Sequence, residues 1–256
     1  MRRQIKFRVL AAVIVILATS INADAQLGGA LNRTRRAVEQ TAKETEQTGE
    51  DVSKIPLQAS VSGNISAGNF VNGTVATVTF NRFPANVNEW KQVRDQIGET
   101  IPGAVALQIM ACELYRRNSA AGTECLILNT VSSSQTSYTS LLMNVASSRP
   151  YQFAAYLKGA SWDNGYNPTK PYTIEIRVTA TSAKDYATYY QADSYKFFIK
   201  SNGHELNGGL QPVSVLKTER PGEPGEGGKY YIVHGSSSIF LQCKEKKFSE
   251  SFNGLD

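Results

Sequence analysis

The residues best suited to chemistry lie close together in the segment 158–172, KGASWDNGYNPTKPY, which mixes aromatic rings with amides and a carboxylate. In a sugar-binding surface, an aromatic ring packs on the apolar face of the sugar while nearby polar groups hydrogen-bond its hydroxyls. This composition therefore predicts a ligand-binding surface. Its candidate residues are Trp162, Asp163, Asn164, Tyr166, Asn167 and Tyr172.

The same segment has a second interpretation, as a structured surface loop. Asn164 and Gly165 favour a turn, and Pro168 and Pro171 stiffen the approach to the strand that follows. The rings would then cover the edge of the core, and we favour this interpretation over ligand binding. Asp163 begins a triplet that resembles part of a calcium loop, but the other ligand positions are absent, so no metal site is expected.

Catalytic patterns are scarce in this chain. Its two histidines, His204 and His234, belong to no HExxH or HxH metal motif, and His204 is expected to be solvated in a turn-rich segment. Ser236 and His234 are a candidate pair of catalytic nucleophile and base, but the sequence contains no GxSxG turn. Phosphate-binding glycine motifs are also missing, so we assign no catalytic residue, cofactor or metal. The sequence leaves enzymatic activity undecided and leans against it.

The chain has three cysteines, Cys112, Cys125 and Cys243, so at least one thiol cannot pair within the chain. Cys112 and Cys125 could close a short disulfide loop in an oxidising compartment. The alternative, slightly favoured, is that all three are buried as small hydrophobic side chains.

The first 25 residues have the pattern of a secretory signal peptide. Four basic side chains precede an apolar stretch over residues 9–18, and Ala23-Asp24-Ala25 supplies the small residues of a cleavage site. The apolar stretch is too short for a stable membrane span. We therefore expect an exported protein, periplasmic or extracellular, with no transmembrane helix once the leader is removed.

Removing this leader changes the charge balance of the chain. The leader holds four of the 27 Lys and Arg residues but only one of the 22 Asp and Glu residues, so the remainder is close to neutral. The basic character is thus largely a property of the leader, and we expect no nucleic-acid partner.

The elements that must position these residues change in kind along the chain. Apolar residues recur with a period near four through residues 86–145, with an Asn86 cap and a left-handed stop at Gly98. Residues 172–180 instead alternate with a period of two. Helices first and strands later predict an α+β fold, with an N-terminal helical section packed on a C-terminal antiparallel β-sheet. Expected helices cover residues 86–97, 102–117 and 125–131, and a fourth helix starts at Ser137. For residues 125–131 a strand is the alternative. Expected strands cover 75–80, 172–180, 195–200, 213–217, 229–234 and 239–243.

Composition also suggests the domain boundaries. Residues 26–57 are polar and are expected to form a flexible or weakly helical spacer. Residues 60–72 are rich in Gly, Ser and Asn and are expected to form a loop or hairpin turns. A single α+β domain then covers residues 58–246, and residues 247–256 form a C-terminal tail.

Several blocks of the sequence resemble a family of uncharacterised bacterial proteins grouped as a domain of unknown function. The blocks are TFNRFPANVNEW, IPGAVALQIMACELY, YLKGASWDNGYNPTKPYTIEI, YKFFIKSNG and KYYIVHGSSS, and GASWDNGYNPTKPYT is the most specific of them. The resemblance covers residues 78–246 and implies a bacterial source. The family carries no activity that could assign a catalytic residue.

Together, the leader and the resemblance predict an exported bacterial protein of the cell envelope that acts by binding or scaffolding rather than by catalysis. The expected partner is an envelope glycan or an envelope protein. The alternative is a periplasmic or secreted hydrolase that acts on glycan or ester substrates.

Overall fold

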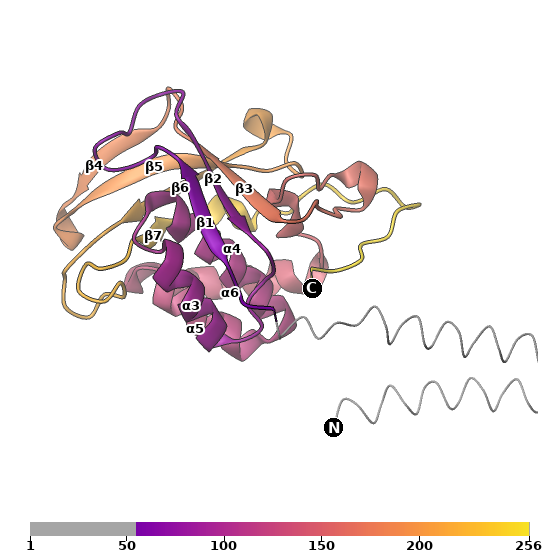
Figure 1. Ribbon diagram of the computed structural model, residues 1–256, viewed down its shortest axis with the longest axis horizontal. Coiled ribbons are helices and arrows are strands. Elements are labelled where there is room, and N and C mark those ends of the chain that lie inside the picture. The colour runs from indigo at the N-terminus through magenta and orange to yellow at the C-terminus, as the bar shows by residue number, and fades with distance from the viewer. Residues whose placement is uncertain (1–54, 256) are drawn as a thin grey trace, which may run out of the picture. The chain divides into compact units, whose positions relative to one another are not determined.

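The computed structural model describes residues 55–255, so the expected leader and residues 26–54 of the expected spacer lie outside the described residues. The described residues belong to one compact unit. They form an α+β fold with a seven-stranded antiparallel sheet, whose strands fan out across one part of Figure 1 while the helices gather in another. No helix in this part of the chain is long and apolar enough to span a membrane.

The sheet runs in the order β1-β2-β3-β5-β6-β7, and β4 pairs with β5. The strands are β1 (Ala59–Gly63), β2 (Val75–Phe80), β3 (Tyr172–Arg177), β4 (Ala183–Ala187), β5 (Ala192–Lys200), β6 (Leu210–Leu216) and β7 (Ile232–Gly235). In β3, Ile174 and Ile176 are buried while Thr173 and Glu175 on the other face stay partly exposed, as the period of two predicts.

Four α-helices lie between β2 and β3: α3 (Val87–Ile97), α4 (Ile101–Arg117), α5 (Ser119–Asn129) and α6 (Ser132–Ser148). The predicted cap of α3 is confirmed, because the Asn86 side chain accepts a hydrogen bond from the Glu89 amide. α5 is the helix that the sequence favoured over a strand. α6 begins earlier than expected, because the distant Glu223 carboxylate accepts hydrogen bonds from the Ser132 amide and hydroxyl, at 2.8 and 2.5 Å.

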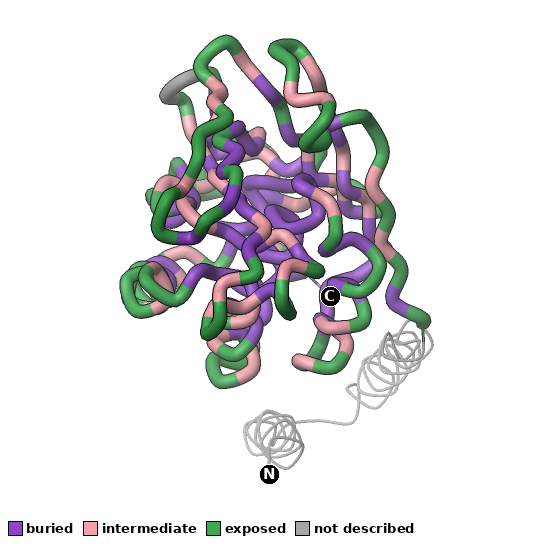
Figure 2. Tube along the Cα trace, turned by 90° about the vertical axis from the view of Figure 1, so that its left-hand side faces the viewer, coloured by how far each residue is buried: buried purple, intermediate pink, exposed green. Residues whose placement is uncertain are grey.

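Helices and strands contribute side chains to one large cluster of buried hydrophobic residues. α4 is buried along residues 101–114, which agrees with its nearly continuous apolar sequence. Figure 2 shows this interior as the purple centre of the molecule, with exposed green segments around it.

Three local expectations were wrong. Residues 60–63, expected in a loop or hairpin turn, belong to the edge strand β1, which pairs antiparallel with β2. Residues 237–240 form a 3₁₀ turn instead of a strand, since the Ile239 carbonyl accepts the Tyr156 hydroxyl at 3.0 Å instead of a strand partner. Gly98 is right-handed, with φ −68°. A Cβ there would lie 2.7 Å from the Arg94 carbonyl oxygen, so close packing explains this glycine.

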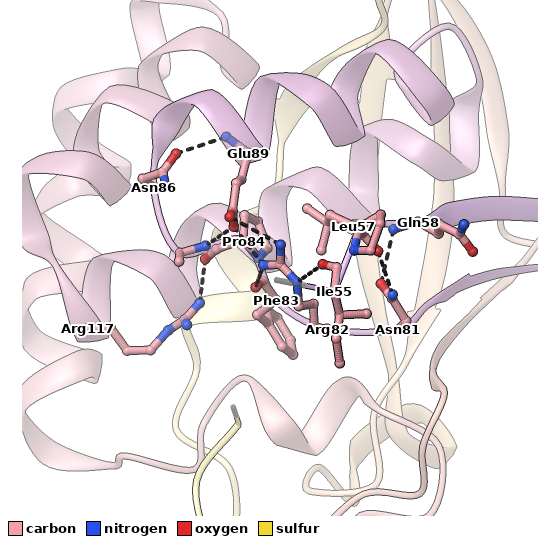
Figure 3. Close-up of polar contacts among 12 residues, drawn as sticks. Ile55, Leu57, Gln58, Asn81, Arg82, Phe83, Pro84, Asn86, Glu89 and Arg117 are labelled. Carbon is pink, nitrogen blue, oxygen red and sulfur yellow. Dashed lines mark hydrogen bonds and ion pairs between the residues drawn. The ribbon is translucent and has the colours of Figure 1, made fainter. Parts of the chain in front are cut away.

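Packing extends beyond the expected domain boundaries, Gln58 and Lys246, at both ends. Arg82 donates from Nε to the Ile55 carbonyl at 2.9 Å and forms two hydrogen bonds with the Glu89 carboxylate, as Figure 3 shows. At the other end, Leu255 is buried in the same core as the helices. The segments on either side of the expected domain are thus held by it.

Candidate functional site

The loop that carries the predicted ligand-binding residues is held by its own hydrogen bonds. Trp162–Asn164 forms a 3₁₀ turn that ends at Gly165, which has φ 67°. The Asn164 amide donates to the Gly159 carbonyl at 2.7 Å and to the Asn167 carbonyl at 3.0 Å, and its oxygen accepts from the Ser161 amide at 2.9 Å. These bonds occupy both ends of the Asn164 side chain.

Two of the predicted aromatic rings lie in the core. Tyr166 is 0% exposed and stacks on Tyr151 at a centroid distance of 4.9 Å, and its hydroxyl donates to the Lys244 carbonyl at 2.6 Å. Burial raises the pKa of the Tyr166 hydroxyl well above its usual value. Tyr172 is 2% exposed and packs against Phe80 and Phe83. Neither ring offers a face to a ligand, which agrees with the surface-loop interpretation.

Asn167 binds a segment of the same chain. Its amide donates to the Ser251 carbonyl at 2.7 Å, and its oxygen accepts from the Asn253 amide at 2.9 Å. Gly165 lies so close to this segment that a Cβ would sit 2.4 Å from the Ser251 oxygen. The loop therefore docks residues 251–253, which the sequence placed in the tail.

Trp162 and Asp163 are the predicted residues that remain near the surface with charged neighbours. The Lys244 and Lys247 ammonium groups lie 4.0 and 4.7 Å from the centroid of the Trp162 ring, in cation–π contacts. Asp163 forms an ion pair with Lys247. The lysines thus already occupy the π-system that a sugar would need.

Neither the candidate disulfide nor the candidate serine–histidine pair forms in the structure. Cys112, Cys125 and Cys243 are buried free thiols, so no Cys112–Cys125 disulfide is formed in the structure. Burial raises the pKa of Cys125 to about 12, which keeps its thiol protonated at neutral pH. His234 Nδ1 lies 3.3 Å from the Ser194 hydroxyl and forms no bond with Ser236. No group of three or more metal-ligating side chains comes together among residues 55–255.

Sequence reasoning missed three adjoining hollows at the end of strand β5. The central hollow, about 480 Å³, is lined by residues that include Gly159, Trp162, Lys200, Asn202 and His204. The sheet-side hollow, about 240 Å³, shares Gly159, Lys200 and Asn202 with it. The outer hollow, about 630 Å³, shares His204. We refer to the three together as the strand-end groove.

The sheet-side hollow lies against the strands. Its lining includes Thr77 of β2 and Thr173, Glu175 and Arg177 of β3. Lys158 reaches this hollow because residues 157–158 run beside β3, with a hydrogen bond of 2.9 Å from the Lys158 amide to the Thr173 carbonyl.

His204 is fixed at the junction of the central and outer hollows. Its Nε2 lies 2.8 Å from the Leu241 carbonyl, which can only accept, so Nε2 carries the proton. The Ser201 hydroxyl then donates to Nδ1 across 2.6 Å. Burial lowers the pKa of His204 below its usual 6.5, so the ring is neutral at pH 7. His204 is therefore partnered, not simply solvated as the sequence predicted.

No single sequence motif marks the strand-end groove. Its walls come from Thr77 and from residues 156–162, 173–177, 200–205, 211–212 and 238–244, which are distant in the sequence and meet only in the folded sheet. The one local signal is the turn-rich segment SNGHE directly after β5, because polar loops at strand ends are where binding groups gather.

The comparisons with known proteins identify one related family. A family described as "Domain of unknown function (DUF6935)" matches residues 82–247. This range contains the loop 158–172 and most of the strand-end groove. No curated protein and no solved structure matches the chain.

Proposed function

Because the chain belongs to the family of this domain of unknown function, we propose a function from its own residues: it is an exported bacterial binding module of the cell envelope, and it binds its partner in the strand-end groove. The leader pattern over residues 1–25 supports export. The proposal includes no catalytic step.

One observation carries this proposal: the three hollows adjoin through shared residues and present side chains that can hydrogen-bond a ligand. Gly159, Lys200 and Asn202 join the central hollow to the sheet-side hollow, and His204 joins it to the outer hollow. A concave surface with a few convergent polar groups is the usual form of a binding site. An elongated partner suits such a groove better than a small compact molecule, so an envelope glycan is our first candidate and an extended segment of an envelope protein the second.

We also infer how the groove is supported. The helical section packs on the sheet, because side chains of α3, α4 and α5 and of the strands share one buried cluster. This packing would hold the carboxyl end of β5 rigid, so the groove would need little rearrangement on binding.

Two measurements test the proposal on the native protein. Cell fractionation with mass spectrometry of the N-terminus should find the chain outside the cytosol and lacking residues 1–25. The purified protein should co-sediment with isolated cell-envelope material, and Trp162→Ala, which alters the central hollow, should reduce this retention. A cytosolic chain that retains Met1 would contradict export, and absence of retention on any envelope fraction would contradict the binding role.

The Ser201–His204 pair favours a second candidate function, the hydrolase. The hydroxyl donates to a neutral imidazole across 2.6 Å, and Leu241 orients that ring, which is the arrangement of an activated nucleophile. Against it, Ser201 is only 1% exposed, and its oxygen also accepts the Gly203 amide. Labelling by a fluorophosphonate probe that Ser201→Ala abolishes would support the hydrolase, and an unlabelled wild-type protein would remove it.

A further inference from the structure

We propose that the strand-end groove recognises an anionic ligand, and that Lys158 and Lys200 are the residues that bind its negative groups. This inference rests on the proposed binding function and names the chemical class of the partner. The ligand would be a polymer that carries carboxylate or phosphate groups, because these anions suit lysine ammonium groups.

The charges that line the groove do not cancel. Its two carboxylates each pair with a cation of the groove itself: Glu175 with Arg177 at 2.5 Å, and Glu205 with Lys244 at 3.0 Å. Lys158 and Lys200 form no ion pair with any residue in the described part of the chain. Since His204 is neutral, the groove keeps two uncompensated positive charges.

These two charges face the same space. Lys158 and Lys200 both line the sheet-side hollow, and Lys200 also lines the central hollow. The Lys200 ammonium donates to the Gly208 carbonyl at 2.5 Å, which holds the end of this long side chain in place and leaves further N–H groups for a ligand. A charge held in place loses less conformational entropy on binding than a free one.

The remaining lining of the central hollow also suits an anion. Its lining residues include no carboxylate. Lys200, Ser161 and Trp162 carry N–H or O–H groups, and Asn202 carries an amide that donates to the Leu157 carbonyl at 3.2 Å. A neutral sugar would need an aromatic face on which to stack, and two ammonium groups already contact the Trp162 ring. The surroundings therefore favour charge pairing over stacking.

The experiment measures binding of three defined probes to the full-length purified protein by calorimetry at low salt. The probes are alginate oligosaccharides, which carry carboxylates, inorganic polyphosphate, which carries phosphates, and neutral dextran. The variants are Lys158→Gln, Lys200→Gln and their combination, with Lys196→Gln as the matched control. Lys196 lies on the same strand as Lys200 but outside the three hollows.

We expect at least one anionic probe to bind and dextran not to bind. Each single substitution in the groove should weaken binding about fivefold, and the double substitution more, because each removes one ionic contact. Lys196→Gln should bind like the wild type, and added salt should weaken binding of the wild type more than that of the double variant. Whether alginate or polyphosphate binds more tightly identifies the anionic group.

Three results would overturn the inference: no binding of either anionic probe, equal binding of dextran, or equal loss of binding in Lys196→Gln and Lys200→Gln. Retention on envelope material distinguishes failure of the anionic-ligand inference from failure of the proposed binding function. If the wild type and the double variant are retained equally, the protein binds envelope material, but Lys158 and Lys200 do not bind the ligand.

Discussion

The loop 158–172 and the strand-end groove adjoin in space and share residues 158–162, but the rest of the loop differs from the groove in where its polar groups bond. In the loop, the side chains of Asn164, Tyr166 and Asn167 bond to backbone groups of the same chain. In the groove, Lys200 and Asn202 also donate to backbone carbonyls, but Lys158 forms no ion pair within the described residues and the Lys200 ammonium keeps further N–H groups. The denser cluster of chemical groups thus holds the fold together, and we propose that the sparser one is left for a partner.

Composition alone therefore does not distinguish a loop that binds a ligand from a loop that docks another segment of its own chain. Aromatic rings and amides suit a sugar, but they suit a buried backbone segment equally well, because its carbonyl and amide groups must also find partners. In this protein, residues 244–253 take the place that a ligand would have.

The largest expected effect comes from truncating the centre of the loop. Tyr166→Ala removes a ring that is completely buried and stacked on Tyr151, so the free energy of unfolding should fall by about 3–5 kcal/mol in urea titration. Trp162→Ala, as the control within the same loop, should cost about 1 kcal/mol, since this ring is only partly buried. Equal costs for the two variants would remove the distinction between core and surface within this loop.

A smaller and more local effect is expected from Asn167→Ala. The variant loses the bonds to Ser251 and Asn253, which should cost about 1–3 kcal/mol and should speed amide exchange in residues 251–255 before other regions. Asn167→Asp keeps the oxygen that accepts from Asn253 and should give an intermediate result. Unchanged exchange in residues 251–255 would mean that the loop does not hold this segment.

Much of the fold follows from the sequence because its signals are local. The cap of α3, the apolar run of α4 and the alternation of β3 each need only a short stretch of chain, and each element lies where the pattern predicts it. Residues 239–243 carry the pattern of a strand, but they bond instead to side chains from residues 152 and 156. The start of α6 likewise depends on a carboxylate 91 residues away.

The candidate site was harder to predict from the sequence, because it also depends on contacts between residues that are distant in the chain. The ligand candidates in the loop 158–172 could be named from their types, but whether their groups remain open depends on residues 244–253, which are distant in the sequence. Lys158 and Lys200 carry no motif of their own. They become a pair only because residues 157–158 run beside β3 and the end of β5 reaches the same hollow.

The histidine of the groove predicts a pH effect on stability. Burial lowers the pKa of native His204 below 6.5, so the unfolded chain binds a proton more readily and acid favours unfolding. Stability should therefore be highest above pH 6.5 and should fall as the pH drops below it. His204→Gln should make this fall shallower in urea titrations between pH 7.5 and 5.5, and part of it should remain because burial also lowers the pKa of His234. An unchanged slope in the variant would mean that His204 titrates normally.

The smallest expected effect is on the stability of the groove variants. Lys200→Gln should change the free energy of unfolding by less than about 0.5 kcal/mol, since Lys200 forms no ion pair within the described residues and its charge is not needed for packing. The thermal midpoint of this variant should match that of Lys196→Gln. A large loss of stability would place Lys200 among the folding residues, as Tyr166 is.

The most direct test of the contrast between loop and groove is an NMR titration of the backbone amides with the anionic probe that binds. We expect chemical-shift changes to concentrate at Gly159, Lys200 and Asn202, while the amides of residues 165–167 keep the chemical shifts of the ligand-free protein. Shift changes centred on residues 165–167, with the end of β5 unaffected, would contradict binding in the groove and would indicate that the loop binds the ligand.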